Sequence, residues 1–175
     1  MSELVVLVDE EGNPTGTADK ARVHGRDTPL HLAFSCHLRN TEGQMLMTRR
    51  SLEKVAWPGV WTNAFCGHPF PGETFEDALE RRAREELGIR IRDVAEILPD
   101  FRYEATDASG IRENEICPVF AAVTDQEPQP DPSEVLEHRW ADPEDIHTAA
   151  SHAPWAFSPW LVRQLEQLTT NGSRR

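Results

Sequence analysis

The stretch 57–89 concentrates side chains that could carry out chemistry. A cysteine and a histidine stand two residues apart at Cys66 and His68, and a run rich in glutamate ends with Glu85 and Glu86. Carboxylate oxygens suit Mg²⁺, especially where phosphate oxygens complete its coordination. The stretch therefore indicates a candidate Mg²⁺ site for a phosphate-containing ligand.

A second group of candidate ligands lies elsewhere in the chain. Glu113 and Glu115 are two residues apart in a predicted strand, so their carboxylates point to the same face. Adjacent carboxylates repel each other unless a cation lies between them, although a solvent-facing acidic edge is the common alternative. Three histidines, His24, His31 and His68, can complete a His₃Glu₂ site. Such mixed ligands suit Zn²⁺, Mn²⁺ or Fe²⁺, and we expect one Mn²⁺ or Zn²⁺ ion.

The residues after Thr74 are predicted to form the helix that carries the glutamates. Thr74 with Asp77 three residues later is a capping-box signature. Gly88 is placed to end the helix in a left-handed conformation. Apolar residues recur at helical spacing, at Phe75, Ala78, Leu79, Ala83 and Leu87. On this pattern alone, an amphipathic surface helix with a solvated charged face is the alternative to a metal site.

Other elements surround this helix. Strands are predicted at 4–8, 31–38, 44–49, 91–98, 101–106, 116–123 and 135–140, and helices at 143–150 and 160–168. His37 lies on the strand 31–38 and is interpreted as structural. One domain is expected over residues 1–168, followed by a disordered tail at 169–175.

The composition of the 175 residues is that of a globular protein, with 38% hydrophobic and 27% charged residues. A net charge of −12 argues against a nucleic-acid partner. The sequence has no run of about 18 apolar residues, so no membrane partner is expected. It has no signal-peptide pattern at its start and three cysteines that cannot all pair, so we expect a cytoplasmic protein. Nothing in the pattern specifies an oligomer, and we expect a monomer.

An acidic chain that binds an anion must concentrate cations locally. Only Lys20 and Lys54 are lysines among the 18 basic residues, and the others are arginines. Because a lysine supplies a compact point charge, both positions are candidate anion contacts, with chance as an equal alternative.

The stretch 67–89 resembles the Nudix motif, which runs Gly, five residues, Glu, seven residues, then Arg-Glu-apolar-x-Glu-Glu-x-Gly-apolar. Gly67 and Glu73 open the match, and the closing positions are Arg81, Ala83, Glu85, Glu86, Gly88 and Ile89. Arg82 stands where the motif has glutamate. Because this change removes a metal ligand and adds a cation, we expect Arg82 to favour binding of a diphosphate.

The chain as a whole resembles the type 1 isopentenyl-diphosphate isomerases, which have the Nudix fold. The shared strings cover roughly residues 4–165 and are HLAFS (31–35), TRR (48–50), AWPGVWTN (56–63), CGHP (66–69), ENEICPVF (113–120) and PWAFSPW (154–160). The resemblance implies an α+β fold, an α/β/α sandwich with a mixed central β-sheet flanked by helices. It also implies that the chain interconverts isopentenyl diphosphate and dimethylallyl diphosphate through a carbocation-like intermediate.

The same resemblance implies roles for individual residues. Cys66 and Glu115 match the catalytic pair, and Tyr103 matches a residue that assists the carboxylate. Mg²⁺ would be held by Glu86, by the backbone carbonyl of Cys66 and by the substrate phosphates. The positions that match diphosphate contacts are Lys20, Arg50 and Lys54.

Trp160 is expected near the start of the last helix, where its indole face can stabilise a carbocation without bonding to it. A core aromatic that anchors the helix is the alternative. Two other functions are weighed: a Nudix pyrophosphohydrolase of a nucleoside diphosphate derivative, and a non-catalytic binding module. Arg82 argues against the hydrolase, and the pairing of Cys66 with Glu115 argues against the binding module.

Overall fold

The computed structural model describes residues 3–172, which form two mixed β-sheets covered by helices. The first sheet has the strand order β2-β1-β3-β10-β9. Its strands are β1 (Leu4–Val8), β2 (Pro14–Asp19), β3 (His31–Leu32), β9 (Arg102–Thr106) and β10 (Arg112–Ile116). The β10–β3 pair is parallel, whereas the other neighbours in this sheet are antiparallel.

The second sheet has the order β12-β5-β4-β11-β8, with β6 paired to β5 and β7 paired to β4. Its strands are β4 (Phe34–Arg39), β5 (Met45–Arg50), β6 (Trp61–Thr62), β7 (Phe65–Gly67), β8 (Arg92–Leu98), β11 (Val119–Val123) and β12 (Val135–Ala141). The β11–β4 pair is parallel.

The two sheets are joined through one long parallel ladder. Strand β3 leads into β4 across Ala33, and β10 leads into β11 across 117–118. Glu115 pairs with His31 in the first sheet and Val119 pairs with Ser35 in the second, which is the same register. Backbone hydrogen bonds from Ala33 and Ser35 continue the ladder through the junction. The parallel pairing therefore places a glutamate of β10 directly beside a histidine of β3.

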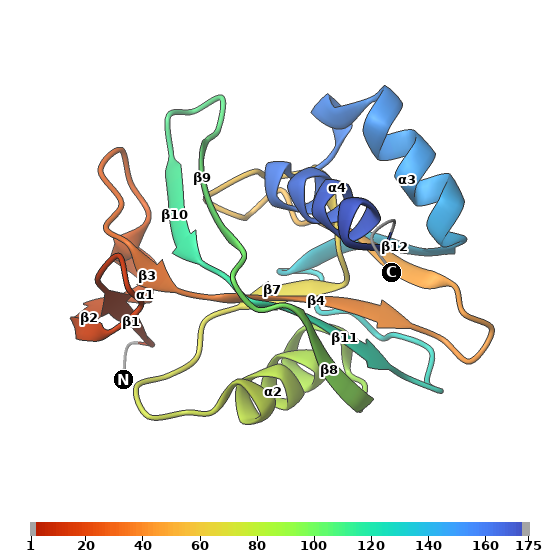
Figure 1. Cartoon of the computed structure of the whole chain (residues 1–175), viewed down its shortest axis with the longest axis horizontal. Coiled ribbons are helices and arrows are strands. Elements are labelled where there is room, and N and C mark those ends of the chain that lie inside the picture. Colours follow the sequence, from red (N-terminus) through yellow and green to blue (C-terminus); the bar gives the residue numbers. More distant parts are fainter. Residues whose placement is uncertain (1–2, 173–175) are drawn as a thin grey trace.

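Helices lie on both sides of this central layer, with α2 on one side and α3 and α4 on the other (Figure 1). The helices are α1 (Lys20–Val23), α2 (Phe75–Leu87), α3 (Pro143–His152) and α4 (Pro159–Gly172), with a 3₁₀ turn η1 at Pro154–Ala156. This arrangement confirms the predicted sandwich with a mixed sheet between helices. None of the helices that the structure describes has the length and apolar character that a membrane crossing requires.

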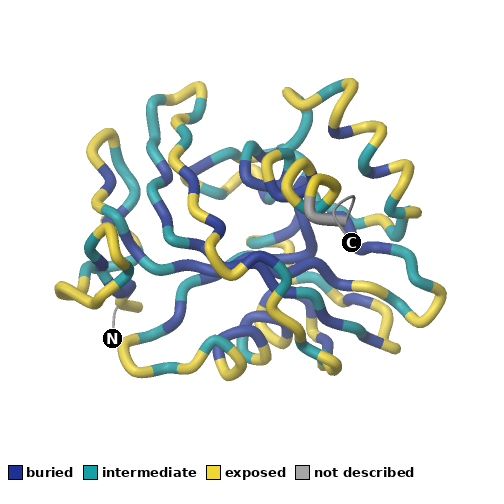
Figure 2. Tube along the Cα trace, in the orientation of Figure 1, coloured by how far each residue is buried: buried dark blue, intermediate teal, exposed yellow. Residues whose placement is uncertain are grey.

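The sheet has an apolar core on each face, and the alternation along β4 separates them. Phe34, Cys36 and Leu38 pack toward α2, whereas Ala33 packs with residues of α3 and α4. The strands at the centre are buried on both faces, and the exposed positions gather in loops and at outer helix faces (Figure 2). Both faces of β4 are therefore interior, and polar side chains on it need internal partners.

The structure differs from the expected elements at short segments and at one end. The elements α1, β6, β7 and η1 were not predicted, because runs of two to four residues carry no hydrophobic period. Strand β2 was also not predicted, because its six residues are mostly exposed and do not alternate between apolar and polar. Helix α4 continues to Gly172, past the expected boundary at 168. The hydroxyls of Thr169 and Thr170 donate to carbonyls one turn earlier, and Thr169 also contacts His147 of α3. Residues 169–172 are thus helical rather than a disordered tail, and residues 173–175 of that expected tail lie outside the described part.

Candidate functional site

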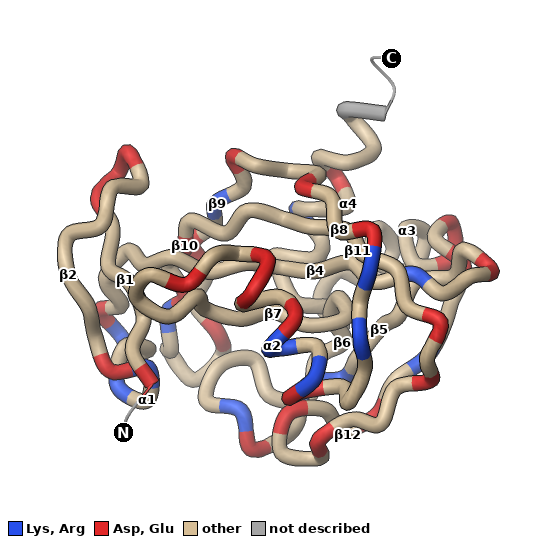
Figure 3. The backbone as a smooth tube through the Cα atoms, turned by 90° about the horizontal axis from the view of Figure 1, so that it is seen from below, with Lys and Arg blue, Asp and Glu red and all other residues tan. Residues whose placement is uncertain are grey.

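The predicted ends of α2 are confirmed. The Thr74 hydroxyl accepts a hydrogen bond from the Asp77 backbone at 3.1 Å, and Gly88 adopts φ 65° in the left-handed region. The helix carries charges of both signs along its surface (Figure 3). Of its charged side chains, Arg82 reaches the wall of the cavity described below.

Glu73 and Arg81 pin the loop before α2. Arg81 donates to both carboxylate oxygens of Glu73 at 2.8 Å and to the His68 carbonyl at 3.1 Å. The Phe70 backbone also donates to Glu73, and the Arg81 guanidinium lies 3.8 Å from the Phe70 ring centre. These two residues of the Nudix motif therefore fix the backbone that carries His68.

A cavity of about 410 Å³ lies between α1, β7, β9, β10 and the N-terminal end of α4. Gly67 forms part of its wall, and a Cβ atom there would lie 2.8 Å from the Phe34 ring and 2.9 Å from Arg82 Cγ. A side chain at 67 would therefore force the wall apart. The charged, sulfur-containing and aromatic lining residues are Glu3, Asp19, Lys20, His24, Arg50, Lys54, Cys66, His68, Arg82, Tyr103, Glu113, Glu115 and Trp160.

One end of this cavity carries a histidine–carboxylate cluster. Ligand atoms of His24, His31, His68 and Glu115 all lie within 4.8 Å of one another. Glu115 Oε1 is 3.0 Å from His68 Nε2, 3.3 Å from His31 Nε2 and 3.9 Å from His24 Nε2. Glu113 joins the cluster through Oε2, which is 3.0 Å from His24 Nε2. The five predicted ligands are therefore neighbours, and they come from β3, from β10 and from the positions just after α1 and β7.

The orientation of these rings suits a bound cation. His31 Nδ1 lies 2.9 Å from the Pro29 carbonyl, which can only accept, so Nδ1 holds the proton and the Nε2 lone pair faces the cluster. The Nε2 atoms of His24 and His31 and Oε2 of Glu113 are buried without an aligned hydrogen bond to the residues described. Unpaired buried donors and acceptors of this kind are costly unless a ligand satisfies them. The residues present therefore fit a divalent metal ion.

The protonation of the cluster reflects its buried negative charge. Burial raises the pKa of Glu113, and the neighbouring Glu115 raises it further. Burial also opposes ionisation of Glu115, but the three neighbouring histidines outweigh it and hold its pKa well below the usual range. Burial would lower the pKa of His24, yet the two carboxylates raise it to about 9. A positive charge at this place is what the carboxylates require.

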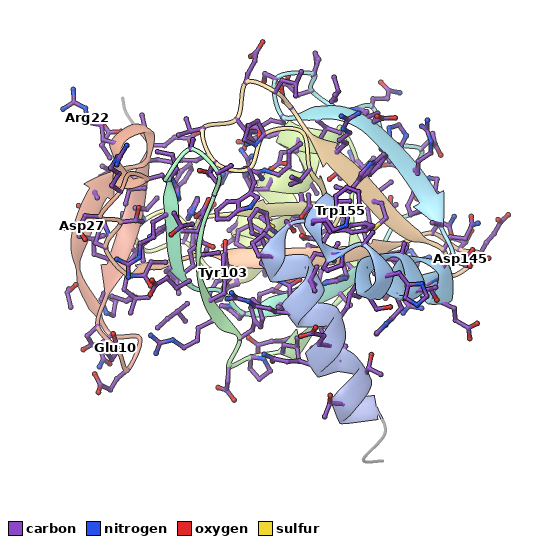
Figure 4. All side chains as sticks on the ribbon, turned by 90° about the horizontal axis from the view of Figure 1, so that it is seen from above. Glu10, Arg22, Asp27, Tyr103, Asp145 and Trp155 are labelled. Carbon is purple, nitrogen blue, oxygen red and sulfur yellow. The ribbon has the colours of Figure 1, made fainter. Side chains whose placement is uncertain are left out.

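Tyr103 lies against the second oxygen of Glu115. Its hydroxyl donates to Glu115 Oε2 at 2.9 Å, and burial raises the pKa of this phenol well above its ordinary value. Figure 4 shows Tyr103 inside the fold, whereas Glu10, Arg22 and Asp27 lie at the periphery. Tyr103 is therefore a fixed hydrogen-bond donor to the carboxylate.

Cys66 lies on β7, paired with Ser35 of β4. Its sulfur is 3.3 Å from Ser35 Oγ, 3.4 Å from Asn63 Nδ2 and 3.5 Å from Asn63 Oδ1. Burial raises the pKa of the thiol to about 11, although the bonds with Ser35 and Asn63 oppose this. Cys66 thus holds its proton at neutral pH and faces the same cavity as Glu115.

Trp160 forms an aromatic wall of the cavity. Its Nε1 donates to Asn63 Oδ1 at 3.1 Å, and its ring centre is 5.6 Å from those of Trp57 and Tyr103. The Arg50 guanidinium carbon lies 5.3 Å from the Trp160 ring centre. The indole is therefore fixed in position and already meets one cation.

The predicted cationic contacts surround the cavity but have partners in this structure. Lys20 pairs with Glu3 at 2.6 Å, and Lys54 pairs with Glu134. Arg50 donates to backbone carbonyls of residues 56 and 57. An anionic ligand would have to compete with two carboxylates for the lysines.

Arg82 lies between carboxylates of α2 and the loop before β12. It pairs with Glu86, with Glu85 at 3.0 Å and with Glu134 at 3.4 Å. Burial would lower the pKa of Arg82, but Glu86 and Glu134 raise it, so the side chain is a permanent cation. Glu86 is buried and is not part of the cavity wall, since Arg82 occupies the adjoining position.

The structure brings the predicted site residues together. His31 and Glu86 are the two that do not line the cavity, and each contacts a residue that does. Residues that sequence reasoning missed are Glu3, Ser35, Asn63, Glu134 and Gln164. Ser35 and Asn63 stand inside shared strings and could have been noticed there, whereas the other three carry no local signal.

Comparison with known proteins gives a consistent result. Residues 29–161 match the NUDIX domain family. The isopentenyl-diphosphate Delta-isomerase of Kocuria rhizophila is 59% identical over 165 residues, covering 94% of this chain and 92% of that protein. The protein of the same name from Agromyces mediolanus is 60% identical and covers 95% of this chain and 81% of its own length.

Solved structures share the fold at lower identity. A protein from Deinococcus radiodurans has a TM-score of 0.73 at 22% identity and covers 95% of this chain and 99% of its own. The MutT protein from Methanosarcina mazei has a TM-score of 0.65 at 20% identity, covering 82% of this chain and 96% of its own. Both likenesses concern the fold alone.

Proposed function

The chain belongs to the isopentenyl-diphosphate Delta-isomerase family of NUDIX-domain proteins, and we propose that the cavity beside Cys66 is where it interconverts isopentenyl diphosphate and dimethylallyl diphosphate. One observation carries this proposal: Cys66 and Glu115 line a single cavity whose other walls hold basic side chains. Cys66 and Glu115 suit proton transfer at carbon, and the basic side chains suit binding of a diphosphate.

The reaction adds one proton to the alkene and removes another from a carbon next to the resulting cation. Cys66 is a thiol at neutral pH because burial raises its pKa to about 11, and Glu115 is ionised because the histidines lower its pKa. One acid and one base are therefore present in the cavity. The two groups exchange their acid and base roles when the reaction runs in the opposite direction.

Aromatic and hydroxyl groups support these two residues. The Trp160 indole offers negative potential to a tertiary carbocation without a lone pair that would trap it. Tyr103 donates to Glu115 Oε2, so it orients the carboxylate whose other oxygen faces the histidines. These contacts keep the base in one position while its charge changes.

The diphosphate end of the substrate is assigned to the basic side of the cavity. Lys20, Arg50, Lys54 and Arg82 all contribute to its wall. The carboxylates that now pair with the lysines, Glu3 and Glu134, are partly exposed, and a phosphate oxygen can replace them as acceptor. Arg82 adds charge here without supplying the metal ligand that a hydrolase uses at this position.

Two divalent ions complete the proposal. The histidines with Glu113 and Glu115 would hold one Mn²⁺ or Zn²⁺, whose charge stabilises ionised Glu115. Mg²⁺ would be held by Glu86, the Cys66 carbonyl and the substrate phosphates, all hard oxygen donors. Arg82 donates to Oε1 of Glu86 in this structure, so Oε2 of Glu86 is the oxygen that would hold the ion.

The remaining expectations belong to the same proposal. Cys36, Cys66 and Cys117 are all free, which supports a reducing compartment such as the cytoplasm. The cavity is lined by residues of one chain, so a monomer is sufficient for the reaction.

A product assay tests the function directly. The purified protein is incubated with isopentenyl diphosphate, Mg²⁺ and Mn²⁺, and the mixture is analysed for the dimethylallyl isomer and for released phosphate or pyrophosphate. We expect the isomer and no released phosphate. Phosphate or pyrophosphate release without isomer would instead assign a Nudix pyrophosphohydrolase.

A further inference from the structure

A line of buried polar side chains runs from Cys66 into the core between β4 and α4. Ser35 Oγ lies 3.3 Å from Cys66 Sγ, Gln164 Nε2 donates to Ser35 Oγ at 3.0 Å, and His37 Nε2 lies 2.9 Å from Gln164 Oε1. Ser35 and Gln164 are fully buried, and His37 is 3% exposed. The packing around this line is otherwise apolar.

The chemistry of the groups gives this line one direction. The Gln164 carbonyl oxygen can only accept, so His37 donates from Nε2. The Gln164 amide nitrogen can only donate, so Ser35 Oγ accepts. A hydroxyl has one proton and two acceptor positions, and the Cys117 sulfur at 3.4 Å can fill the second acceptor position. The Ser35 proton is then left for the Cys66 sulfur.

The line also ties the sulfur to the helix that carries the aromatic wall. Gln164 stands four residues after Trp160 on α4, so both side chains point to the same face of that helix. Trp160 Nε1 bonds to Asn63, and Asn63 contacts Cys66 Sγ. Two sets of hydrogen bonds therefore connect α4 to the Cys66 sulfur, one from Trp160 through Asn63 and the other from Gln164 through Ser35.

We propose that Ser35, oriented by Gln164 and His37, is a positioning residue that holds the Cys66 sulfur toward the substrate during isomerisation. The proposal rests on the proposed role of Cys66 in proton transfer. A sulfur held by a directed donor keeps one rotamer, and proton transfer to carbon depends steeply on that placement. Apolar side chains would pack this interface without any need for such a hydrogen-bonded set, and each of its members is costly when left unpaired.

The test measures kcat and KM for isomerisation of isopentenyl diphosphate in Ser35→Ala, Gln164→Met and the double variant. Each single variant is expected to lose about tenfold in kcat, about 1.4 kcal/mol in activation free energy, with KM changed by less than about twofold. The double variant should lose no more than Ser35→Ala, since Gln164 acts on the sulfur only through Ser35. If the loss of kcat in the double variant equals the product of the two single losses, the proposal is overturned.

His37 provides a rescue experiment that does not depend on Ser35→Ala folding. His37→Gln keeps an N–H donor that can reach Gln164, whereas His37→Leu removes it. We expect His37→Gln to keep kcat within about twofold of the parent and His37→Leu to lose severalfold in kcat per folded protein. His37→Leu should also have a lower melting midpoint, because it leaves the buried Gln164 Oε1 without a donor. If the two variants have equal kcat, or if their losses of activity only match the loss of folded protein, these hydrogen bonds serve the structure alone and the positioning role is overturned.

Two reference variants separate this proposal from the function itself. Thr124→Val removes two hydrogen bonds of a buried hydroxyl, one to the Arg90 carbonyl and one from the Gln126 backbone, at a place remote from Cys66, and should leave kcat unchanged. Cys66→Ala tests the proposed function. An inactive Cys66→Ala with a fully active Ser35→Ala would overturn the positioning role alone, whereas an active Cys66→Ala would overturn the role of the cysteine.

Discussion

At the scale of single residues, the proposed chemistry depends on how burial acts on Cys66 and Glu115. Burial disfavours the charged form of both groups. It prevails at Cys66, whose pKa rises to about 11, and it is overcome at Glu115 by three histidines. One cavity therefore holds a proton donor and a proton acceptor at neutral pH, which is what alkene isomerisation requires.

Cys66→Ala tests the donor. We expect isomerisation to fall by about 10²–10⁴, the usual contribution of a general acid or base. Folding and metal content should be unchanged, because the sulfur is not among the predicted metal ligands. Cys36→Ala is the matched control, since Cys36 lies on the opposite face of β4 and packs toward α2. Activity of Cys66→Ala within about tenfold of the parent would remove the thiol from the mechanism.

Trp160 is the second residue whose role can be separated from packing. A desolvated cation–π contact is worth about 2 kcal/mol, or roughly 30-fold in rate. The carbocation exists only near the transition state, so Trp160→Leu should lose at least about 30-fold in kcat with little change in KM. Trp160→Phe should keep partial activity.

Melting curves of both Trp160 variants provide the control, because the indole is buried and donates to Asn63. An activity loss in Trp160→Leu that only matches its lost folded fraction would make the indole a core anchor. The cation would then have to be stabilised elsewhere in the cavity.

The identity of individual site residues was easier to predict from the sequence than their contacts. Cys66, His68, Glu113 and Glu115 stand in short specific strings, so their candidacy needs no knowledge of the fold. The hydrogen bonds of Gln164 were not predictable, because its partners Ser35 and His37 are 129 and 127 positions away. His37 appeared structural on its own strand, and only α4 gives it a connection toward Cys66.

At the scale of elements, α2 shows how a helix can carry both fold and function. Thr74 and Gly88 fix its ends, so both could be predicted from residue type alone. The short strand β7 could not, because its three residues pair with β4 for reasons of tertiary structure. Yet β7 presents Cys66, and the residue that follows it is His68. The elements with the weakest sequence signal thus position the most important side chains.

Arg82 on α2 lines the end of the cavity that we propose for the diphosphate, and it pairs with Glu86 and Glu134. Arg82→Glu should raise KM for isopentenyl diphosphate by tenfold or more, about 1.4 kcal/mol. It should also lower stability by about 3–5 kcal/mol, because the buried Glu86 carboxylate loses its partner. Arg82→Lys is the control that keeps a charge but loses the fork of donors. An unchanged KM in well-folded Arg82→Glu would place this guanidinium outside substrate binding.

At the scale of the whole molecule, the histidine–carboxylate cluster joins parts that are distant in sequence. His24 caps the end of α1, His31 begins β3, His68 follows β7, and the carboxylates lie on β10. The parallel ladder that unites the two sheets sets His31 against Glu115. The family resemblance implied a mixed sheet between helices but not its division in two, because strand pairing across 84 positions leaves no local period.

Metal binding should therefore stabilise the entire fold as well as the reaction. A ligand that binds only the folded state at about 100 times its Kd adds about 2.7 kcal/mol. For a domain of this size, that corresponds to roughly 5–10 °C in melting midpoint. Chelation of a Mn²⁺- or Zn²⁺-loaded protein should lower the midpoint by that amount, and restoring the metal should reverse the change.

His68→Ala connects this stabilisation to the cluster. The substitution removes one nitrogen ligand, so elemental analysis should find less bound metal and chelation should shift the melting midpoint less than in the parent. Isomerase activity should fall together with the metal content. His138→Ala is the matched control, because His138 contacts Glu127 far from the cluster and should leave metal content unchanged. If His68→Ala keeps the stoichiometry, affinity and chelator response of the parent, the five residues do not form one metal site, and the charge of Glu115 is held by the histidines alone.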